Sequence, residues 1–218
     1  MSKSSLIRLI KAFTVSAVAV YVFVNGPSFY VNAQFWLRQA KPAETKVSAS
    51  GLAVIAPILL PISTLDQQPL SNQATITIEK INVSAVPIVF GVGSNPDDIY
   101  KNLTNGVVHY SPTGKPGQGG PSVILCHSSL YPWQYNKYGA PCALVGKLVA
   151  GDRITVRYSD GRIFNFLMKQ SIIFNPLEAG GDKRLAELES NPKPTIILVT
   201  CWPINTSKQR IALVAELE

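Results

Sequence analysis

Three residues at the ends of apolar runs are of types that together could carry out nucleophilic catalysis. Cys201 ends the run TIILVTC, His127 ends the run PSVILCH, and Arg210 opens the run QRIALVAEL as its second residue. A thiol can attack a carbonyl carbon, an imidazole can accept and donate the proton, and a guanidinium can stabilise the oxyanion that forms. The three types therefore predict a cysteine-dependent acyl-transfer site, provided that the fold brings them together.

The positions of these residues favour such a meeting. A cysteine at the end of a strand can keep its backbone buried while its sulfur faces a groove, and His127 stands in the same relation to its own run. The turn-prone segment PINTSK follows Cys201, so a hairpin would return Arg210 to the thiol. Each residue alone has an ordinary structural interpretation, as an inert buried cysteine, a structural histidine or a solvated edge arginine. Their joint arrangement is what favours catalysis.

His109 is the alternative acid/base residue, and we favour His127 because it directly follows an apolar strand. The spacing of possible metal ligands is poor, since adjacent Cys126 and His127 would point to opposite faces of a strand and there is no CxxC pair. A zinc site that combines Cys142 and Cys201 with both histidines is conceivable but is not our prediction. No glycine-rich phosphate loop follows a strand. We expect no metal and no other cofactor.

The elements that must position these residues are short β-rich runs separated by turn residues. They have no βαβ rhythm, and the longest pair forms a hairpin about Asp160-Gly161, a dipeptide typical of tight connections. Short helices are expected from 94 to 103, over 143–149 and over 183–189. This pattern predicts an all-β fold, a small closed eight-stranded barrel. The expected strands are 74–81, 83–90, 106–110, 121–127, 153–159, 162–174, 195–201 and 209–217.

The net charge of +7 belongs mainly to the N-terminal part of the chain. Residues 1–46 contain six basic residues and one acidic residue, which accounts for +5 of the total. The rest of the chain has no basic run with interleaved aromatic residues. We therefore predict no nucleic-acid binding.

An uncharged stretch between Lys11 and Arg38 predicts a membrane span. About 20 residues at 1.5 Å each cross a hydrocarbon core of about 30 Å, and we assign a transmembrane signal anchor to 12–36, interrupted at 25–28. The basic residues of 1–11 indicate a cytoplasmic N-terminus and an extracellular remainder, hence a single-pass protein of the cell membrane. The alternative is a cleaved signal peptide, because Val31-Asn32-Ala33 resembles a cleavage site.

The segment 37–74 is predicted to be a linker or stalk that precedes a domain over 75–218. It is rich in proline and serine, and it contains a second apolar stretch, Gly51–Ile62, which is too short to span a membrane. The chain also has three cysteines, an odd number, so at least one thiol stays unpaired within the chain.

Several segments of the predicted domain resemble the sortase family. ILVTCWP followed by Arg210 resembles the family signature, in which a Thr-Cys pair closes one strand and an arginine begins the next. PGQGGPSVILCHSS is similar to the segment that leads to the family's histidine, and GVVHYSPTGKPG to the stretch before it. ITIEKINVSAVPIV and LVAGDRITVRY are similar to the opening strands and the middle hairpin. The resemblance covers about residues 75–217, in family order.

The resemblance implies a membrane-anchored cysteine transpeptidase that cleaves an LPxTG-like C-terminal sorting signal of surface proteins. Cys201 would form a thioacyl intermediate, His127 would act as acid and base, Arg210 would stabilise the reacting carbonyl, and Thr200 would help to position the peptide. The acceptor would be an amine from a cell-wall precursor or a pilin lysine. The connection 175–194 lies where the family recognises its signal.

The chain also departs from the family pattern. The residue before the family's histidine is commonly glycine, and here it is Cys126, which we interpret as a small buried strand residue in preference to a redox group. A disulfide to Cys142 is possible, although nothing in the sequence requires it. No second C-terminal anchor and no lid motif are evident, which argues against a pilus-polymerising subtype. The alternatives are a cysteine protease that hydrolyses the same signal, and a non-catalytic membrane-tethered barrel that binds peptides.

Overall fold

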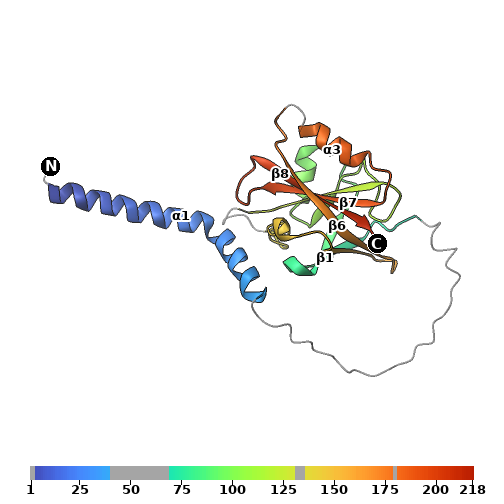
Figure 1. The fold of residues 1–218 in the computed structure, drawn as a ribbon, viewed down its shortest axis with the longest axis horizontal. Helices are drawn as coiled ribbons and strands as arrows, with labels where there is room; N and C mark the ends of the chain where they lie inside the picture. Colours follow the sequence, from blue (N-terminus) through green and yellow to red (C-terminus); the bar gives the residue numbers. More distant parts are fainter. Residues whose placement is uncertain (1–2, 40–68, 131–135, 179–180) are drawn as a thin grey trace, which may run out of the picture.

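The computed structural model describes residues 3–39, 69–130, 136–178 and 181–218. Most of the predicted linker 37–74, including the apolar stretch Gly51–Ile62, lies outside the described residues. What is described consists of a long N-terminal helix and a β-barrel with short helices around it (Figure 1).

The predicted fold class is confirmed, because eight strands close into a barrel in the order β1-β2-β3-β4-β7-β8-β6-β5. Neighbouring strands are antiparallel except for two parallel pairs, β2 with β3 and β4 with β7. The strands are β1 Ala74–Ile78, β2 Val83–Val89, β3 Val107–His109, β4 Pro121–Cys126, β5 Arg153–Tyr158, β6 Ile163–Phe174, β7 Thr195–Trp202 and β8 Gln209–Leu217. The helices are α1 Lys3–Gln39, α2 Pro96–Asn102 and α3 Gly181–Glu189, with 3-10 turns η1 Glu79–Ile81 and η2 Val145–Lys147.

Strand β7 is apolar on both of its faces because both are buried. Ile196 and Leu198 point into the barrel core, and Ile197 and Val199 belong to a second apolar cluster on the outside of the sheet. Helix α3 covers that outer cluster with leucines on one of its faces. A strand buried on both sides has no alternation of polar and apolar residues, which explains the unbroken run TIILV.

Local signals account for the short elements. The Asn95 side chain accepts hydrogen bonds from the backbone of Asp97 and Asp98 and caps α2, which begins with a proline in its first turn. The hairpin between β5 and β6 turns at Asp160 and Gly161, as predicted, and Gly161 has a φ of 93°, which an L-residue rarely adopts.

Helix α1 continues through residues 25–28, so the predicted interruption there is wrong. A proline inside a helix removes one backbone hydrogen bond and bends the helix without having to end it, and α1 changes direction between its N-terminal and C-terminal parts (Figure 1). Ser4–Gly26 is the part of the described helices that is long and apolar enough to cross a membrane. This part begins and ends earlier than the predicted span 12–36.

The second part of α1 lies against the barrel. Phe35 is buried in the core cluster, and Val31 packs against the same cluster. The Lys147 ammonium group on η2 lies 5.3 Å from the centre of the Trp36 ring. The end of the helix is therefore a contact surface for the domain, a role that the sequence did not indicate.

Candidate active site

The strand register brings Cys201, His127 and Arg210 side by side. Cys201 on β7 is the direct partner of Arg210 on β8. The β4–β7 ladder ends with Cys126 opposite Thr200, and His127 directly follows Cys126, so continuing the same register by one position beyond β4 sets His127 level with Cys201. Since neighbouring strands are about 4.8 Å apart, these three residues form a short row across adjacent strands, which we call the outer row.

The outer row lies on the outer face of the sheet. Side chains alternate between faces along a strand, and Val199 and Ala212, two positions from Cys201 and Arg210, belong to the outer apolar cluster. All three residues of the outer row are half-buried, and Cys201 is a free thiol. The row can therefore meet a substrate while its backbone stays fixed in the barrel wall.

Arg210 is held by the hairpin that joins β7 to β8. Its Nη1 donates to the carbonyl oxygens of Ser207 and Gln209, at 3.0 and 3.1 Å. Nε and Nη2 make no hydrogen bond to any residue that the structure describes. A guanidinium has donors at both of these nitrogens, so it can bind an anionic oxygen beside Cys201 without losing its own anchor.

His127 has an environment suited to proton transfer. Burial lowers the pKa of its imidazole below the usual value, so more of the ring is neutral near pH 7. The ring meets Tyr100 of α2 edge-on, with the ring centres 5.7 Å apart. Within the described residues, no side chain is hydrogen-bonded to the His127 ring. Its orientation therefore depends on the backbone that carries it and on the contact with Tyr100.

His109, the alternative acid/base residue, lies inside the barrel. It is 4% exposed, its Nε2 is 2.8 Å from the carbonyl oxygen of Gly114, and its ring packs against Phe90. Burial lowers its pKa, the bond to Gly114 opposes this, and the nearby Lys115 adds to the lowering. His109 pairs with Ile124, three residues before His127 and about 10 Å away along the strand.

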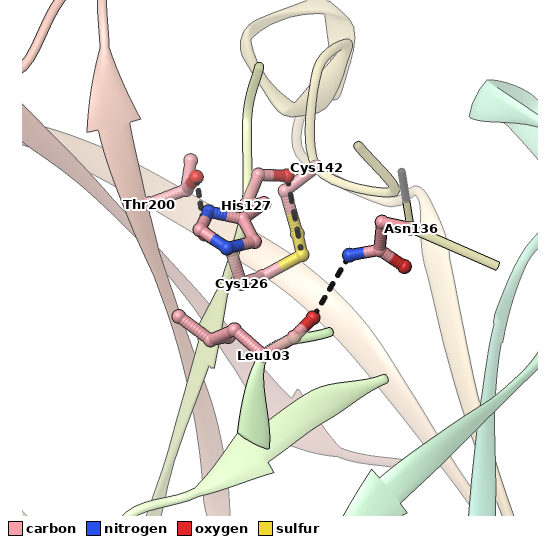
Figure 2. Close-up of a disulfide and its surroundings, with 6 residues drawn as sticks. All are labelled: Leu103, Cys126, His127, Asn136, Cys142 and Thr200. Atoms are coloured by element: carbon pink, nitrogen blue, oxygen red, sulfur yellow. Dashed lines mark hydrogen bonds between the residues drawn. A yellow bond between two sulfur atoms is a disulfide. The ribbon is translucent and has the colours of Figure 1, made fainter. Parts of the chain in front are cut away.

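Thr200 and Cys126 face the interior, one position from the outer row. Thr200 is 3% exposed, and its hydroxyl donates to the carbonyl oxygen of Cys126 at 2.6 Å. Cys126 is buried, as predicted, but it forms a disulfide with Cys142, so our interpretation of it as a simple small residue is corrected (Figure 2). The spacing of the two cysteines in the sequence could not show that a loop brings them together.

Two aromatic contacts near the row were missed, one at the His127 ring and one behind Cys201, where Trp202 packs against the barrel core. Tyr100 touches the His127 ring, and no pattern in the short helix α2 pointed to it. Trp202, which follows Cys201, lies against η2, where a Cβ placed on Gly146 would come within 2.5 Å of its ring. The Trp-Pro pair after the cysteine was a visible signal, but its contact with Gly146 depends on the fold.

These observations define the class of the protein. It is a closed β-barrel that presents one free thiol, one imidazole and one guanidinium in a row across three adjacent strands. That combination has the parts of a cysteine-nucleophile acyl-transfer site.

The sortase domain family matches residues 76–218, which is more than half of the chain. The chain therefore belongs to the sortase family, a family of cysteine transpeptidases. No curated protein sequence matches the chain.

Solved sortase structures share this fold. Sortase A from Corynebacterium diphtheriae (a lid mutant) has 22% identity and a TM-score of 0.54, with 70% of this chain and 73% of that chain covered. Sortase C1 of GBS pilus island 1 has 22% identity and a TM-score of 0.53, over 68% of this chain and 66% of that chain. A Clostridium perfringens sortase D5 transpeptidase has 25% identity and a TM-score of 0.50, over 72% and 85%. The chain thus spans about two thirds of the length of sortase C1.

Proposed function

We propose that this protein is a membrane-anchored sortase that cleaves an LPxTG-like C-terminal sorting signal of surface proteins and transfers the new acyl end to an amine. Cys201 is the nucleophile, His127 is the acid and base, and Arg210 stabilises the oxyanion. The observation that carries this proposal is the outer row, in which these three side chains share one face of adjacent strands.

The chemistry requires two balanced steps. His127 takes the proton of the Cys201 thiol, the sulfur attacks the carbonyl carbon, a carbon–sulfur bond forms as the carbonyl π bond opens, and Arg210 donates hydrogen bonds to the resulting oxyanion. The carbon–nitrogen bond then breaks, and His127 gives its proton to the departing amine. In the second step an incoming amine attacks the thioester, His127 takes its proton, and the Cys201 sulfur leaves. The acceptor is an amine of a cell-wall precursor or a pilin lysine.

Thr200 contributes indirectly to peptide positioning. Its hydroxyl is buried against the Cys126 carbonyl and is not exposed to a substrate. The hydrogen bond joins β4 to β7 one position before the outer row, so it keeps His127 and Cys201 in register. We propose this alignment as the way in which Thr200 supports binding of the peptide.

The connection between β6 and β7 is the proposed wall of the peptide groove. Its helix α3 packs leucines on the same outer face that carries the row. Leu177 in this connection is 92% exposed, although it is large and apolar. Leu177 lies three residues after Phe174, the strand partner of Arg210, and an exposed leucine there suits the leucine-proline part of a sorting signal, because contact would remove apolar surface from water on both sides.

The proposed location is the cell membrane, with one span, a cytoplasmic N-terminus and an extracellular barrel. The apolar part Ser4–Gly26 of α1 is not buried against the rest of the protein, which leaves it available to lipid. The basic residues at its start favour a cytoplasmic N-terminus. The packing of Phe35 on the barrel supports an uncleaved anchor, since cleavage after Ala33 would separate this contact from the span.

The test uses the full-length chain in detergent micelles with a panel of LPxTG-like peptides, with and without amine acceptors. Intact-mass spectrometry follows a thioacyl adduct on Cys201 and the released product, with Cys201→Ala as the control. An adduct and an amine-transfer product in the native chain alone support the proposal. Hydrolysis as the sole outcome at saturating acceptor would make the protein a cysteine protease. No adduct with any peptide would contradict catalysis and favour a peptide-binding barrel.

A further inference from the structure

The disulfide Cys126–Cys142 lies directly behind the acid/base residue. Cys126 is the residue before His127, and its sulfur points into the barrel to reach Cys142 (Figure 2). The disulfide therefore ties the strand end that carries His127 to Cys142, which lies 16 residues after Cys126 in the chain. Both cysteines are buried, at 5% and 2% exposure, so the bond is closed off from solvent.

Backbone hydrogen bonds hold His127 from the same side. The Cys142 N–H donates to the carbonyl oxygen of His127 at 2.9 Å, so Cys142 binds the segment both by its sulfur and by its amide. Thr200 donates to the carbonyl oxygen of Cys126 at 2.6 Å. The peptide units on both sides of the His127 Cα are thus tied to other parts of the chain.

Asn136, six residues before Cys142, supports the helix that carries the aromatic residue against the His127 ring. It donates from its side-chain amide to the carbonyl oxygen of Leu103 at 3.0 Å (Figure 2). Leu103 caps the C-terminal end of α2, and α2 carries Tyr100, whose ring meets that of His127. Cys142 therefore contacts the backbone of His127, and Asn136 supports the helix that makes the ring contact.

We propose that the Cys126–Cys142 disulfide is a positioning device that fixes His127 opposite Cys201. The inference rests on the proposed acid/base role of His127. Cysteine–histidine sites usually orient the base by a hydrogen bond from a third group, and no described side chain makes such a bond to the His127 ring. The ring is oriented instead through its backbone, which is held by the disulfide, the Cys142 amide and the Thr200 hydroxyl.

The same geometry keeps the Cys126–Cys142 disulfide apart from the Cys201 thiol. Cys126 points to the inner face of the sheet, and Cys201 lies on the outer face at the next position. A disulfide between these two would require one side chain to cross the strand, because bonded cysteines need Cβ atoms about 3.8 Å apart. The pairing therefore leaves Cys201 as the free thiol in an oxidising compartment.

The first check is the pairing itself. Full-length protein, prepared without reductant, is alkylated and digested, and mass spectrometry identifies the labelled cysteines. We expect one label per chain, on Cys201, and a peptide in which residues 126 and 142 are cross-linked. Labels on Cys126 and Cys142 in the folded protein would overturn the proposal.

The main test compares the double variant Cys126→Ala/Cys142→Ala with Met168→Ala. Met168 is a buried β6 residue toward the other end of the β6–β8 ladder from Arg210, so its loss destabilises the barrel without touching the outer row. We expect the double variant to lose about tenfold to hundredfold in kcat with little change in KM, since small misplacements of a catalytic group have effects of this size. Met168→Ala keeps the native kcat at temperatures below its melting transition.

A second readout does not depend on the peptide substrate. The chain has two histidines, so the His127 ring signal can be identified by NMR with a His109→Gln variant. Burial lowers the pKa of His127 in the native protein, and we expect it to rise toward the ordinary value in the double variant but not in Met168→Ala. This readout remains valid if the native protein forms no thioacyl adduct, so failure of the proposed function is distinguishable from failure of the positioning role.

If the double variant does not fold, Thr200→Val and Thr200→Ser test the same idea with the disulfide intact. The valine removes the hydrogen bond to the Cys126 carbonyl and keeps the shape, and the serine keeps the hydroxyl. We expect Thr200→Val to lower kcat about threefold to tenfold, and Thr200→Ser to retain it. An unchanged kcat together with an unmoved pKa of His127, in the double variant or in Thr200→Val, would overturn the proposal.

Discussion

The two faces of the sheet formed by β4, β7 and β8 contain similar residue types in different states. On the inner face Cys126 is in a disulfide, Thr200 is hydrogen-bonded to a backbone carbonyl, and both are almost fully buried. On the outer face, one position further along each strand, His127 and Cys201 are half-buried, and Cys201 is a free thiol. Adjacent residues thus have bonded, buried side chains with a structural role on the inner face and partly exposed, reactive types of side chain on the outer face.

This difference arises because consecutive residues at a strand end point to opposite faces of the sheet, so one can be bonded inside the barrel while the next faces outward. Cys126 and Thr200 are bonded within the barrel, and these bonds fix the backbone of the residues that follow them, His127 and Cys201. The arrangement depends on register, since a slip by one residue would exchange the two faces. Antiparallel pairing of β7 with β8 and parallel pairing of β4 with β7 both contribute to that register.

The largest expected effect comes from removing the outer thiol. Cys201→Ala leaves the disulfide intact and should abolish the thioacyl adduct, with a loss in kcat/KM of roughly 10⁴-fold or more. Steady-state kinetics and intact mass measure this loss, and a melting curve confirms the fold. A residual rate within tenfold of the native rate would show that another group is the nucleophile.

The two histidines provide the next test of the contrast between the faces. His127→Ala should lower kcat by about 10²- to 10⁴-fold, because it removes the proton donor and acceptor. His109→Ala should keep the native kcat but lower the free energy of unfolding by about 1–3 kcal/mol, because the Gly114 carbonyl loses its partner and the buried ring is removed.

Kinetics and denaturant unfolding of both histidine variants measure these effects. The reverse pattern, with loss of kcat in His109→Ala alone, would show that His109 on the inner face is the acid/base residue.

A conservative change at Arg210 should have a smaller effect. Arg210→Lys keeps the charge but loses the fork of donors that reaches both the hairpin carbonyls and the oxyanion, and we expect a loss in kcat of about 10²-fold. Arg153→Lys on β5 is the matched control, since its ion pair with Glu218 is exposed. Equal kcat values for the two variants would contradict the proposed role of Arg210 in stabilising the oxyanion.

The smallest expected effect concerns stability and pH. Burial lowers the pKa of both histidines in the folded state, so the unfolded chain binds protons at a higher pH than the folded chain does. The free energy of unfolding should therefore have its full value above the ordinary histidine pKa, and it should decrease as the pH falls toward the lowered pKa values of the folded state.

Denaturant unfolding between about pH 7.5 and about pH 5.5 measures this dependence, and His109→Gln should reduce it. Asp160, whose pKa is lowered to about 2 by its bonds to Arg162, does not titrate in this window. A stability that rises as the pH falls would contradict neutral, buried histidines.

Much of the barrel could be predicted because its signals are local. Apolar runs bounded by turn residues predicted all eight strands, and Asp160-Gly161 predicted the β5–β6 hairpin. The parallel pairing of β4 with β7 could not be predicted from these signals, because nearly half of the domain lies between the two strands in the sequence. The residues of the outer row could therefore be predicted to meet only on the condition that their strands are neighbours.

The parts that sequence reasoning missed all depend on contacts between distant segments. The odd number of cysteines required one free thiol but could not choose between the three possible pairings, and the loop that brings Cys142 to Cys126 has no sequence signature. Phe35 belonged to an apolar stretch that was assigned to the membrane, yet it packs on the barrel. Apolar character alone does not distinguish a lipid contact from a protein contact.

The most direct test of the outer row is the rate at which Cys201 reacts with iodoacetamide as a function of pH, in native, His127→Ala and His109→Ala proteins. Cys201 is the free cysteine, so the measurement needs no knowledge of the natural substrate. We expect His127→Ala to change the shape of the pH–rate profile, and we expect the His109→Ala profile to superimpose on that of the native protein. A profile that is unchanged by His127→Ala, or changed by His109→Ala instead, would contradict the pairing of His127 with Cys201.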